Sequence, residues 1–93
     1  MISQFFVYIL RCADDSYYVG HTDNLEQRLF EHAIRKFSGY TSTRLPVVLL
    51  FYQRFDLRED AFTAERKIKG WNRLKKEALI KNGWKGLIEL CKK

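Results

Sequence analysis

The sequence predicts a single α+β domain in which a small three-stranded, largely antiparallel sheet is flanked by helices. Three observations support this prediction. The chain has 93 residues, which is enough for one domain and too few for two. Its first apolar runs are short, aromatic and β-branched, as strands are. Later segments repeat apolar residues three and four apart, as helices do. The expected order is β-β-α-β-α-α, with a core over about residues 5–80 and a short helix or cap over residues 84–93.

The first two strands form a predicted hairpin. The run Phe5–Leu10 is apolar on both faces, which favours a central position in the sheet. A turn signal follows at residues 13–16, and strand character resumes at Tyr17–Val19. Tyr8 and Tyr18 share a face of this hairpin if the connecting loop has an odd number of residues.

The first helix is expected to begin at Asp23, an N-cap residue that is followed three residues later by the capping-box acid Glu26. Behind this start, apolar residues recur four apart and define one core-facing stripe. The stripe consists of Leu25, Leu29, Ala33 and Phe37. A polar, turn-rich segment then runs from residue 38 to Pro46, which biases Leu45 toward an extended conformation.

The second half of the chain carries one more predicted strand and two predicted helices. Val47–Tyr52 is expected to be a second buried strand. Asp56 with Glu59 repeats the helix-start pattern, and Gly70 is a candidate end or bend. Between them, apolar residues alternate at intervals of four and three, which marks a core-facing stripe: Leu57, Ala61, Ala64, Ile68 and Trp71. A third helix fits residues 72–81, and the Asn82-Gly83 pair that follows is expected to end it.

Positive charge is concentrated in one segment. Lys and Arg number 17 against 11 Asp and Glu, which gives a net charge of +6. Residues 66–81 contain seven of the basic residues and one acid, Glu77. Such clustering is typical of a polyanion binder, because neutralised phosphates release counterions. We therefore expect a nucleic-acid contact made by Arg66, Lys67, Lys69, Arg73, Lys75 and Lys76. A surface helix rich in lysine for solubility is an equal alternative, and a membrane-surface helix comes third.

The remaining composition excludes several classes of protein. The longest apolar run has six residues, far short of the roughly 20 that span a bilayer, and no cationic segment precedes it as in a secretory signal. Cys12 and Cys91 are the only cysteines and cannot make a disulfide scaffold. With two histidines they are also a thin basis for a structural zinc site. We expect a cytoplasmic protein with reduced thiols and no membrane contact.

Three features exceed what packing alone requires. Tyr8 and Tyr18 pair across the hairpin, either as ordinary cross-strand packing or as functional phenols. Arg28 and His32 lie four apart beside the apolar stripe of the first helix, at the rim of the core; a solvated helix flank is the alternative. Glu65 falls on the edge of an apolar helix face, where a carboxylate needs a partner. A salt bridge to Arg28 and a bound metal ion are equal alternatives for that partner.

One carboxylate, one arginine, one histidine and two phenols suit phosphodiester chemistry. Mg²⁺ often takes only one or two carboxylates and keeps several waters, so Glu65 alone can suffice. The cation polarises a phosphoryl oxygen, and an arginine grips the phosphate with two hydrogen bonds. A tyrosine base poised near pH 7 needs its pKa lowered by about 3 units, roughly 4 kcal/mol. His32 or His21 needs far less tuning.

Together these residues resemble the GIY-YIG nuclease domain, which also forms the amino-terminal incision domain of a component of the ABC excinuclease. The resemblance is closer to small stand-alone bacterial GIY-YIG proteins and covers the chain from about Phe5 to Ile80. It rests on Val7-Tyr8-Ile9-Leu10, on Tyr18-Val19-Gly20, on the run from Leu25 to His32, and on Glu65 with Ile68-Lys69. The order and spacing of these pieces are more specific than any one of them.

The resemblance implies a role for each matched residue. Tyr8 and Tyr18 would be the two signature tyrosines, which orient or deprotonate the attacking water. Arg28 would stabilise the phosphate, and Glu65 would be the sole protein ligand of one divalent cation. His32 occupies the helix position where the family carries a His or Tyr that contacts water or phosphate.

The match to the family pattern has departures. His21 follows the signature glycine, where only some members place a basic residue. Phe6 occupies the glycine position of the first motif, Val7 its middle position, and Val19 replaces the isoleucine of the second motif. These changes remove no chemical group, but Phe6 is expected to narrow the approach to Tyr8.

The predicted function is that of an endonuclease that depends on Mg²⁺ or Mn²⁺ and hydrolyses DNA in preference to RNA. Branched, nicked or damaged DNA, as in repair or recombination, is the expected substrate. The alternative is a nucleic-acid-binding module that keeps the fold but not useful turnover. A third interpretation is an adaptor domain whose basic segment binds an acidic protein.

Overall fold

The computed structural model describes residues 4–34 and 44–91 of the chain, with side chains up to residue 83. Three antiparallel strands form one sheet in the order β2-β1-β3. β1 (Phe5–Arg11) is central, as its two-sided apolar pattern predicts, and it is flanked by β2 (Tyr17–Thr22) and β3 (Val48–Phe55). The predicted hairpin and the element order β-β-α-β-α-α are both confirmed.

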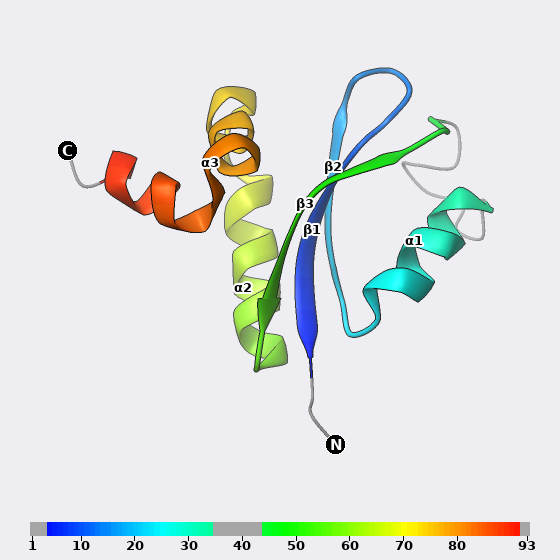
Figure 1. Ribbon diagram of the computed structural model, residues 1–93, viewed down its shortest axis with the longest axis horizontal. Coiled ribbons are helices and arrows are strands. Elements are labelled where there is room, and N and C mark those ends of the chain that lie inside the picture. The colour runs from blue at the N-terminus through cyan, green and yellow to red at the C-terminus, as the bar shows by residue number, and fades with distance from the viewer. Residues whose placement is uncertain (1–3, 35–43, 92–93) are drawn as a thin grey trace.

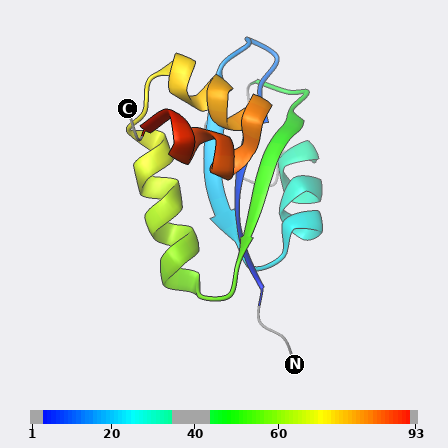
Figure 2. The same cartoon turned by 60° about the vertical axis from the view of Figure 1, so that its left-hand side comes forward.

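Helices cover both faces of the sheet (Figure 1, Figure 2). α1 (Leu25–Ala33) lies on one face, whereas α2 (Arg58–Lys69) and α3 (Arg73–Cys91) lie on the other. Side chains alternate along a strand, so odd-numbered residues of β1 and β2 face α2, and even-numbered residues face α1. The core on the α2 side is formed by Val7, Ile9, Val19, Ala64, Ile68 and Leu79.

α1 begins one residue later than predicted. Asn24, not Asp23, is the N-cap, because its side-chain oxygen accepts the backbone N–H of Gln27 at 3.1 Å. The hydroxyl of Thr22 at the end of β2 accepts the N–H of Asn24 at 3.1 Å and so fixes this cap. The carboxylate of Asp23 instead pairs with Arg58 at 3.4 Å.

α2 also begins later than predicted, after Leu57 and not at Asp56. Leu57 has an extended backbone and makes no capping hydrogen bond, while Asp56 pairs with Arg54 at 3.0 Å. The middle of the predicted stripe is buried, as expected: Ala61, Ala64 and Ile68. Its first member, Leu57, is 59% exposed, so the stripe reaches the core only one turn into the helix. Gly70 ends α2 as predicted.

β3 is an edge strand and is less buried than predicted. It runs from Val48 to Phe55, whereas the sequence predicts a buried strand over residues 47–52. Val48 and Tyr52 are exposed, and the pairing with β1 shifts register between Ile9 and Leu10. An edge position leaves one side of the strand open, which an apolar run alone does not reveal.

α3 contains the predicted helix end. The side chain of Asn72 accepts the N–H of Lys75 at 2.9 Å and starts the helix. Gly83, with φ 74°, interrupts helical geometry where the Asn-Gly pair predicts a stop, and a second helical stretch continues to Cys91. No helix within the described ranges is long and apolar enough to cross a membrane.

The side of α1 that is turned toward the sheet is polar, contrary to the predicted apolar stripe. Its buried residues are Glu31 and His32. Of the predicted stripe, Leu25 and Leu29 are half-buried and Ala33 is exposed, while Phe37 lies outside the described residues. The even-numbered face of β1 presents the hydroxyl of a buried tyrosine, which requires polar partners on the covering helix. α1 therefore buries Glu31 and His32 beside the predicted stripe, whose leucines are only half-buried.

Candidate active site

Tyr8 and Tyr18 lie on the α1 face of the hairpin. Tyr8 is opposite Gly20 and Tyr18 is opposite Leu10, so the two tyrosines are diagonal neighbours across the strand pair. Their ring centroids are 6.3 Å apart. The loop between the strands, residues 12–16, has an odd number of residues, which puts both rings on one face as predicted.

His32 joins the two tyrosines into one cluster. Tyr8 is fully buried, and its hydroxyl oxygen lies 3.1 Å from His32 Nε2. The imidazole is edge-on to both phenols, with centroids 6.0 Å from Tyr8 and 5.2 Å from Tyr18. The predicted position of His32 at the rim of the core is too shallow, because the residue is 3% exposed.

Burial keeps Tyr8 and His32 uncharged. It raises the pKa of the Tyr8 phenol well above its ordinary range, and the nearby Tyr18 raises it further while Arg28 lowers it. Burial lowers the pKa of His32, the Arg28 guanidinium lowers it further, and Glu31 acts in the opposite direction. Near pH 7 Tyr8 therefore carries its proton and His32 is an uncharged imidazole.

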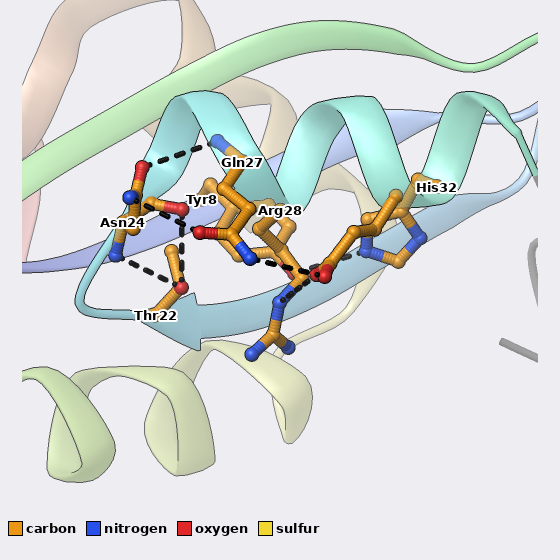
Figure 3. A network of polar contacts seen from close by, with 7 residues as sticks. Tyr8, Thr22, Asn24, Gln27, Arg28 and His32 are labelled. Carbon is orange, nitrogen blue, oxygen red and sulfur yellow. Dashed lines mark hydrogen bonds and ion pairs between the residues drawn. The ribbon is translucent and has the colours of Figure 1, made fainter. Parts of the chain in front are cut away.

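Arg28 lies one turn before His32 on α1 and is half-buried. Its Nε is 3.6 Å from Oε1 of Glu31. Figure 3 shows its guanidinium leaving α1 and reaching over β2. The predicted alternative in which Arg28 forms a salt bridge with Glu65 is wrong, because the partners of Glu65 are His21 and Lys69.

Glu65 and His21 meet on the other face of the sheet. Glu65 is a buried residue of α2, and its Oε1 is 2.8 Å from Nδ1 of His21 in β2. Its Oε2 is 3.4 Å from Nζ of Lys69, one turn further along α2. The Glu65 side chain is 11% exposed, so it is largely but not completely shielded from solvent. Phe62 packs edge-on against the His21 ring at 5.4 Å between centroids.

The two groups of side chains come together at β2. Within the described residues β2 pairs only with β1, and α1 and α2 lie on opposite faces of the sheet beside it. Electrostatics links the two faces, since the charge of Glu65 is among those that raise the pKa of Tyr8, after burial and Tyr18. The predicted site residues are thus gathered around one edge strand, four of them on the α1 face and two on the α2 face.

The donor atoms around Glu65 fit one hard divalent cation. The described residues contain no group of three or more His, Cys, Asp or Glu side chains suited to hold a metal ion, which zinc would need. A single carboxylate suits Mg²⁺ or Mn²⁺, because Mg²⁺ often takes only one or two carboxylates and keeps several waters. Lys69 is half exposed, so its ammonium group can leave the carboxylate when a cation takes its place. The residues present therefore fit the predicted cation.

Some residues of the predicted basic segment lie beside the candidate site, whereas others make contacts that stabilise the fold. Lys69 pairs with Glu65, and Arg66 lies over the Phe62 ring at 5.6 Å, so both are beside the candidate site. Lys75 lies over the Trp71 ring at 4.7 Å. Lys67 is exposed and Lys76 is half-buried.

Arg73 differs from the rest of that segment, because it ties α3 to the β1–β2 turn. Its Nη1 donates to the carbonyl oxygen of Asp15 at 2.8 Å, and its Nη2 is 3.3 Å from the Asp15 carboxylate. Its Nε is 3.4 Å from Glu77, and its guanidinium stacks on Tyr17 at 4.2 Å. These contacts serve packing, whereas the sequence predicts only a phosphate contact.

A family model described as the GIY-YIG catalytic domain matches residues 4–78 of this chain. The chain belongs to the GIY-YIG family. A "UPF0213 protein" of Natronomonas pharaonis is 41% identical over 80 residues, which cover 86% of this chain and 94% of that protein. A "UPF0213 protein" of Staphylococcus haemolyticus is 38% identical over 79 residues, which cover 85% of this chain and 96% of that protein.

Solved structures confirm the GIY-YIG-like fold. The solution NMR structure of a UPF0213 protein from Bacillus halodurans is 36% identical, with a TM-score of 0.57 over 87% of both chains. The solution NMR structure of a protein from E. faecalis is 34% identical, with a TM-score of 0.59 over 84% of this chain and 83% of that one. The predicted resemblance to small stand-alone proteins is confirmed, since the GIY-YIG region accounts for nearly the whole length of the relatives. Family membership gives the chain a nuclease-type fold.

The departure at the first GIY-YIG motif has a structural explanation. Phe6 stands on the α1 face and packs edge-on against Tyr52 of β3 at 6.1 Å between centroids. With Leu29 and Leu49 it lines a groove of about 460 Å³ between α1 and β3. The Phe6 ring therefore packs beside Tyr52, the β3 residue that is paired with Tyr8, and the narrowing of the approach to Tyr8 stays a prediction.

Two residues at the GIY-YIG site make contacts that were not predicted from the sequence. Glu31 pairs with Arg28 three residues earlier, and Lys69 pairs with Glu65 four residues earlier. Both spacings place side chains on one helix face, so a search for acid–base pairs three and four apart finds them.

Acidification is expected to destabilise the protein through His32. Because burial and Arg28 lower its folded-state pKa, the unfolded chain binds a proton below pH about 6.5 that the folded chain does not. Stability that is present above this pH is lost as the pH falls through the folded-state pKa. Urea unfolding over roughly pH 4–8 should show that the free energy of unfolding falls less on acidification in His32→Gln than in the wild type. A His32 pKa at or above the ordinary value, read by NMR titration of the ring, would contradict this prediction.

Proposed function

We propose that this protein is a metal-dependent endonuclease that hydrolyses phosphodiester bonds in DNA. The observation that carries the proposal is the gathering of two phenols, an arginine and a carboxylate around the edge strand β2. A nuclease-type fold and a net charge of +6 agree with a nucleic-acid substrate. We propose branched, nicked or damaged DNA in the cytoplasm as that substrate, with a role in repair or recombination.

The difference in burial supports different roles for the two tyrosines. Tyr8 has no exposed surface and shares a hydrogen bond with His32, so its part is to fix the imidazole orientation. Tyr18 is the partly exposed phenol of the pair and is placed to orient the attacking water. Arg28 reaches over β2 and is placed to hold oxygens of the scissile phosphate.

Glu65 would hold one Mg²⁺ or Mn²⁺ ion, which supplies a Lewis acid for the phosphate and charge stabilisation for the leaving oxygen. His21 contacts the same carboxylate and would keep its orientation. Arg66 and Lys67, at the end of α2, would contact the DNA backbone, and Lys75 and Lys76 at the start of α3 would extend this contact.

A cleavage assay with a matched pair of tyrosine variants tests this function. Duplex, nicked and flapped DNA and the corresponding RNAs are incubated with purified protein in Mg²⁺, Mn²⁺ or EDTA. Tyr18→Phe is expected to slow cleavage by about a hundredfold, in the range that positioned proton-transfer groups supply. Tyr52→Phe is the control, because Tyr52 is 56% exposed on β3 and lies outside the cluster.

The outcomes separate the proposal from its alternative. Cleavage that needs the cation, is slowed in Tyr18→Phe and is kept in Tyr52→Phe supports the endonuclease. Salt-dependent binding to DNA without cleavage of any substrate overturns it in favour of a binding module. Equal cleavage by both variants overturns the role of Tyr18.

A further inference from the structure

Glu31 is a buried acid that core packing does not require. It also has no role in the proposed reaction. It is one of two buried residues of α1, with 8% of its surface exposed, whereas its neighbour Phe30 on the same helix is 62% exposed. A carboxylate in such a position costs free energy unless it is paired. An apolar residue at position 31 would fill the same space without this cost. The partners of Glu31 therefore indicate what the acid is for.

A series of polar contacts connects Thr22 of β2 to Glu31. Figure 3 shows Thr22, Asn24 and Gln27, the residues that lead to Glu31. Thr22, the last residue of β2, accepts the N–H of Asn24, and the side chain of Asn24 caps Gln27. The amide of Asn24 also donates to Oε1 of Gln27 at 3.3 Å, which fixes the Gln27 side chain. Gln27 Nε2 then donates to Glu31 Oε2 at 3.3 Å. One carboxylate oxygen of Glu31 is thus connected through Gln27 and Asn24 to Thr22 at the end of the edge strand.

The other oxygen of Glu31 contacts the arginine of the candidate site. Glu31 Oε1 lies 3.6 Å from Nε of Arg28, and the Glu31 side chain is 11% exposed while that of Arg28 is 35% exposed. An ion pair that is partly shielded from water is stronger than one on an open surface. Nε is the inner nitrogen of the guanidinium, so this contact sets the direction of the group without covering its outer edge.

We propose that Glu31 is a positioning residue of the site, which holds Arg28 in the orientation that grips the scissile phosphate. This inference rests on the proposed function for its consequence in catalysis, but not for the contact itself. Arg28 is mounted on a helix of nine residues and needs a lateral tether, because an arginine side chain has many rotamers. The contacts from Thr22 through Gln27 supply that tether and connect it to β2, the strand that also carries Tyr18.

Glu31→Gln removes the charge at nearly constant volume, and Glu26→Gln is the matched control. Glu26 is an exposed acid in the first turn of the same helix, where its charge stabilises the helix but lies outside this chain of contacts. Glu31→Gln is expected to lower kcat for DNA cleavage by about tenfold or more with a smaller change in KM, because misplacement of a positioned group by about 1 Å has such effects. Glu26→Gln is expected to leave both constants unchanged.

Two further measurements separate positioning from a purely structural role. In the free protein, the ¹H–¹⁵N signal of Arg28 Nε is expected to shift toward that of a solvent-exposed arginine in Glu31→Gln, and to stay in place in Glu26→Gln. In an Arg28→Ala background, Glu31→Gln is expected to cause no further loss of kcat. An additive loss in that background, or an Arg28 signal that does not move, overturns the inference. An Arg28 signal that moves in a protein without cleavage activity supports the positioning contact and overturns the proposed function alone.

Discussion

Replacing Gly20 by alanine is expected to destabilise the protein by about 1–3 kcal/mol and to disable the candidate site. A Cβ atom at position 20 would lie 2.6 Å from the hydroxyl oxygen of Tyr8 and 2.7 Å from its Cζ. The same atom would be 3.1 Å from Cε1 of Tyr18. Tyr8 is fully buried and contacts His32, so its rigid ring has no free space to enter. The added methyl group must push Tyr8 away from His32 or move β2.

Urea unfolding of Gly20→Ala measures the first effect, and cleavage of DNA measures the second. Gly70→Ala is the control, because a Cβ there meets only the Lys67 carbonyl oxygen at 3.5 Å and the Arg66 carbonyl oxygen at 3.9 Å, and the backbone is helical. That variant is expected to be stabilised by about 0.4–1 kcal/mol. In a Tyr8→Ala background the cost of Gly20→Ala should largely disappear, since the clashing ring is gone. If the destabilisation of the double variant equals the sum of the two single variants, the Tyr8 ring does not pack closely against Gly20.

The sequence predicts the burial of a strand well when that burial follows from the strand's own run of apolar residues. Phe5–Leu10 is apolar on both faces, and only a central strand buries both, so its place in the sheet is determined by composition. β3 has a similar apolar run but lies at an edge. Its half-exposed state depends on which strand is its neighbour, and that information is not local.

The start of α1 shows that the strand before a helix can determine which residue becomes the N-cap. Asp23 and Asn24 are equally good N-cap residues by type. Asn24 takes the role because the hydroxyl of Thr22 holds its backbone at the end of β2. The sequence places both candidates within one residue of the true start, but the strand that leads into the helix makes the choice.

The candidate site was predictable in its members and not in its contacts. Tyr8, Arg28 and Glu65 attract notice because their chemistry exceeds what packing needs. The pairing of Glu65 with His21 joins residues 44 positions apart, on different elements, and no spacing rule reports it. The polar inner face of α1 was also missed, because the partner that decides it is the buried hydroxyl of Tyr8.

Replacing Glu65 by glutamine is expected to reduce cation-dependent DNA cleavage by about a hundredfold or more. Charge stabilisation by a bound cation is worth several kcal/mol in the transition state, and each 1.4 kcal/mol is about tenfold in rate. The loss should be confined to function, because the amide oxygen of the variant can still accept a hydrogen bond from Nδ1 of His21. The free energy of unfolding, measured in urea, is therefore expected to change by only about 1 kcal/mol.

Binding of the cation can be measured without cleavage. Mn²⁺ is paramagnetic, so amide signals of α2 near Glu65 should broaden on its addition to the wild type and persist in Glu65→Gln. Glu59→Gln is the matched control, because Glu59 is an exposed acid in the first turn of the same helix and carries the same charge. Broadening that is lost equally in both variants would indicate a diffuse attraction to negative charge and not a site at Glu65. If instead Glu65→Gln keeps both the broadening and the rate of cleavage, the carboxylate serves only as the partner of His21 and Lys69, and the cation must be held elsewhere.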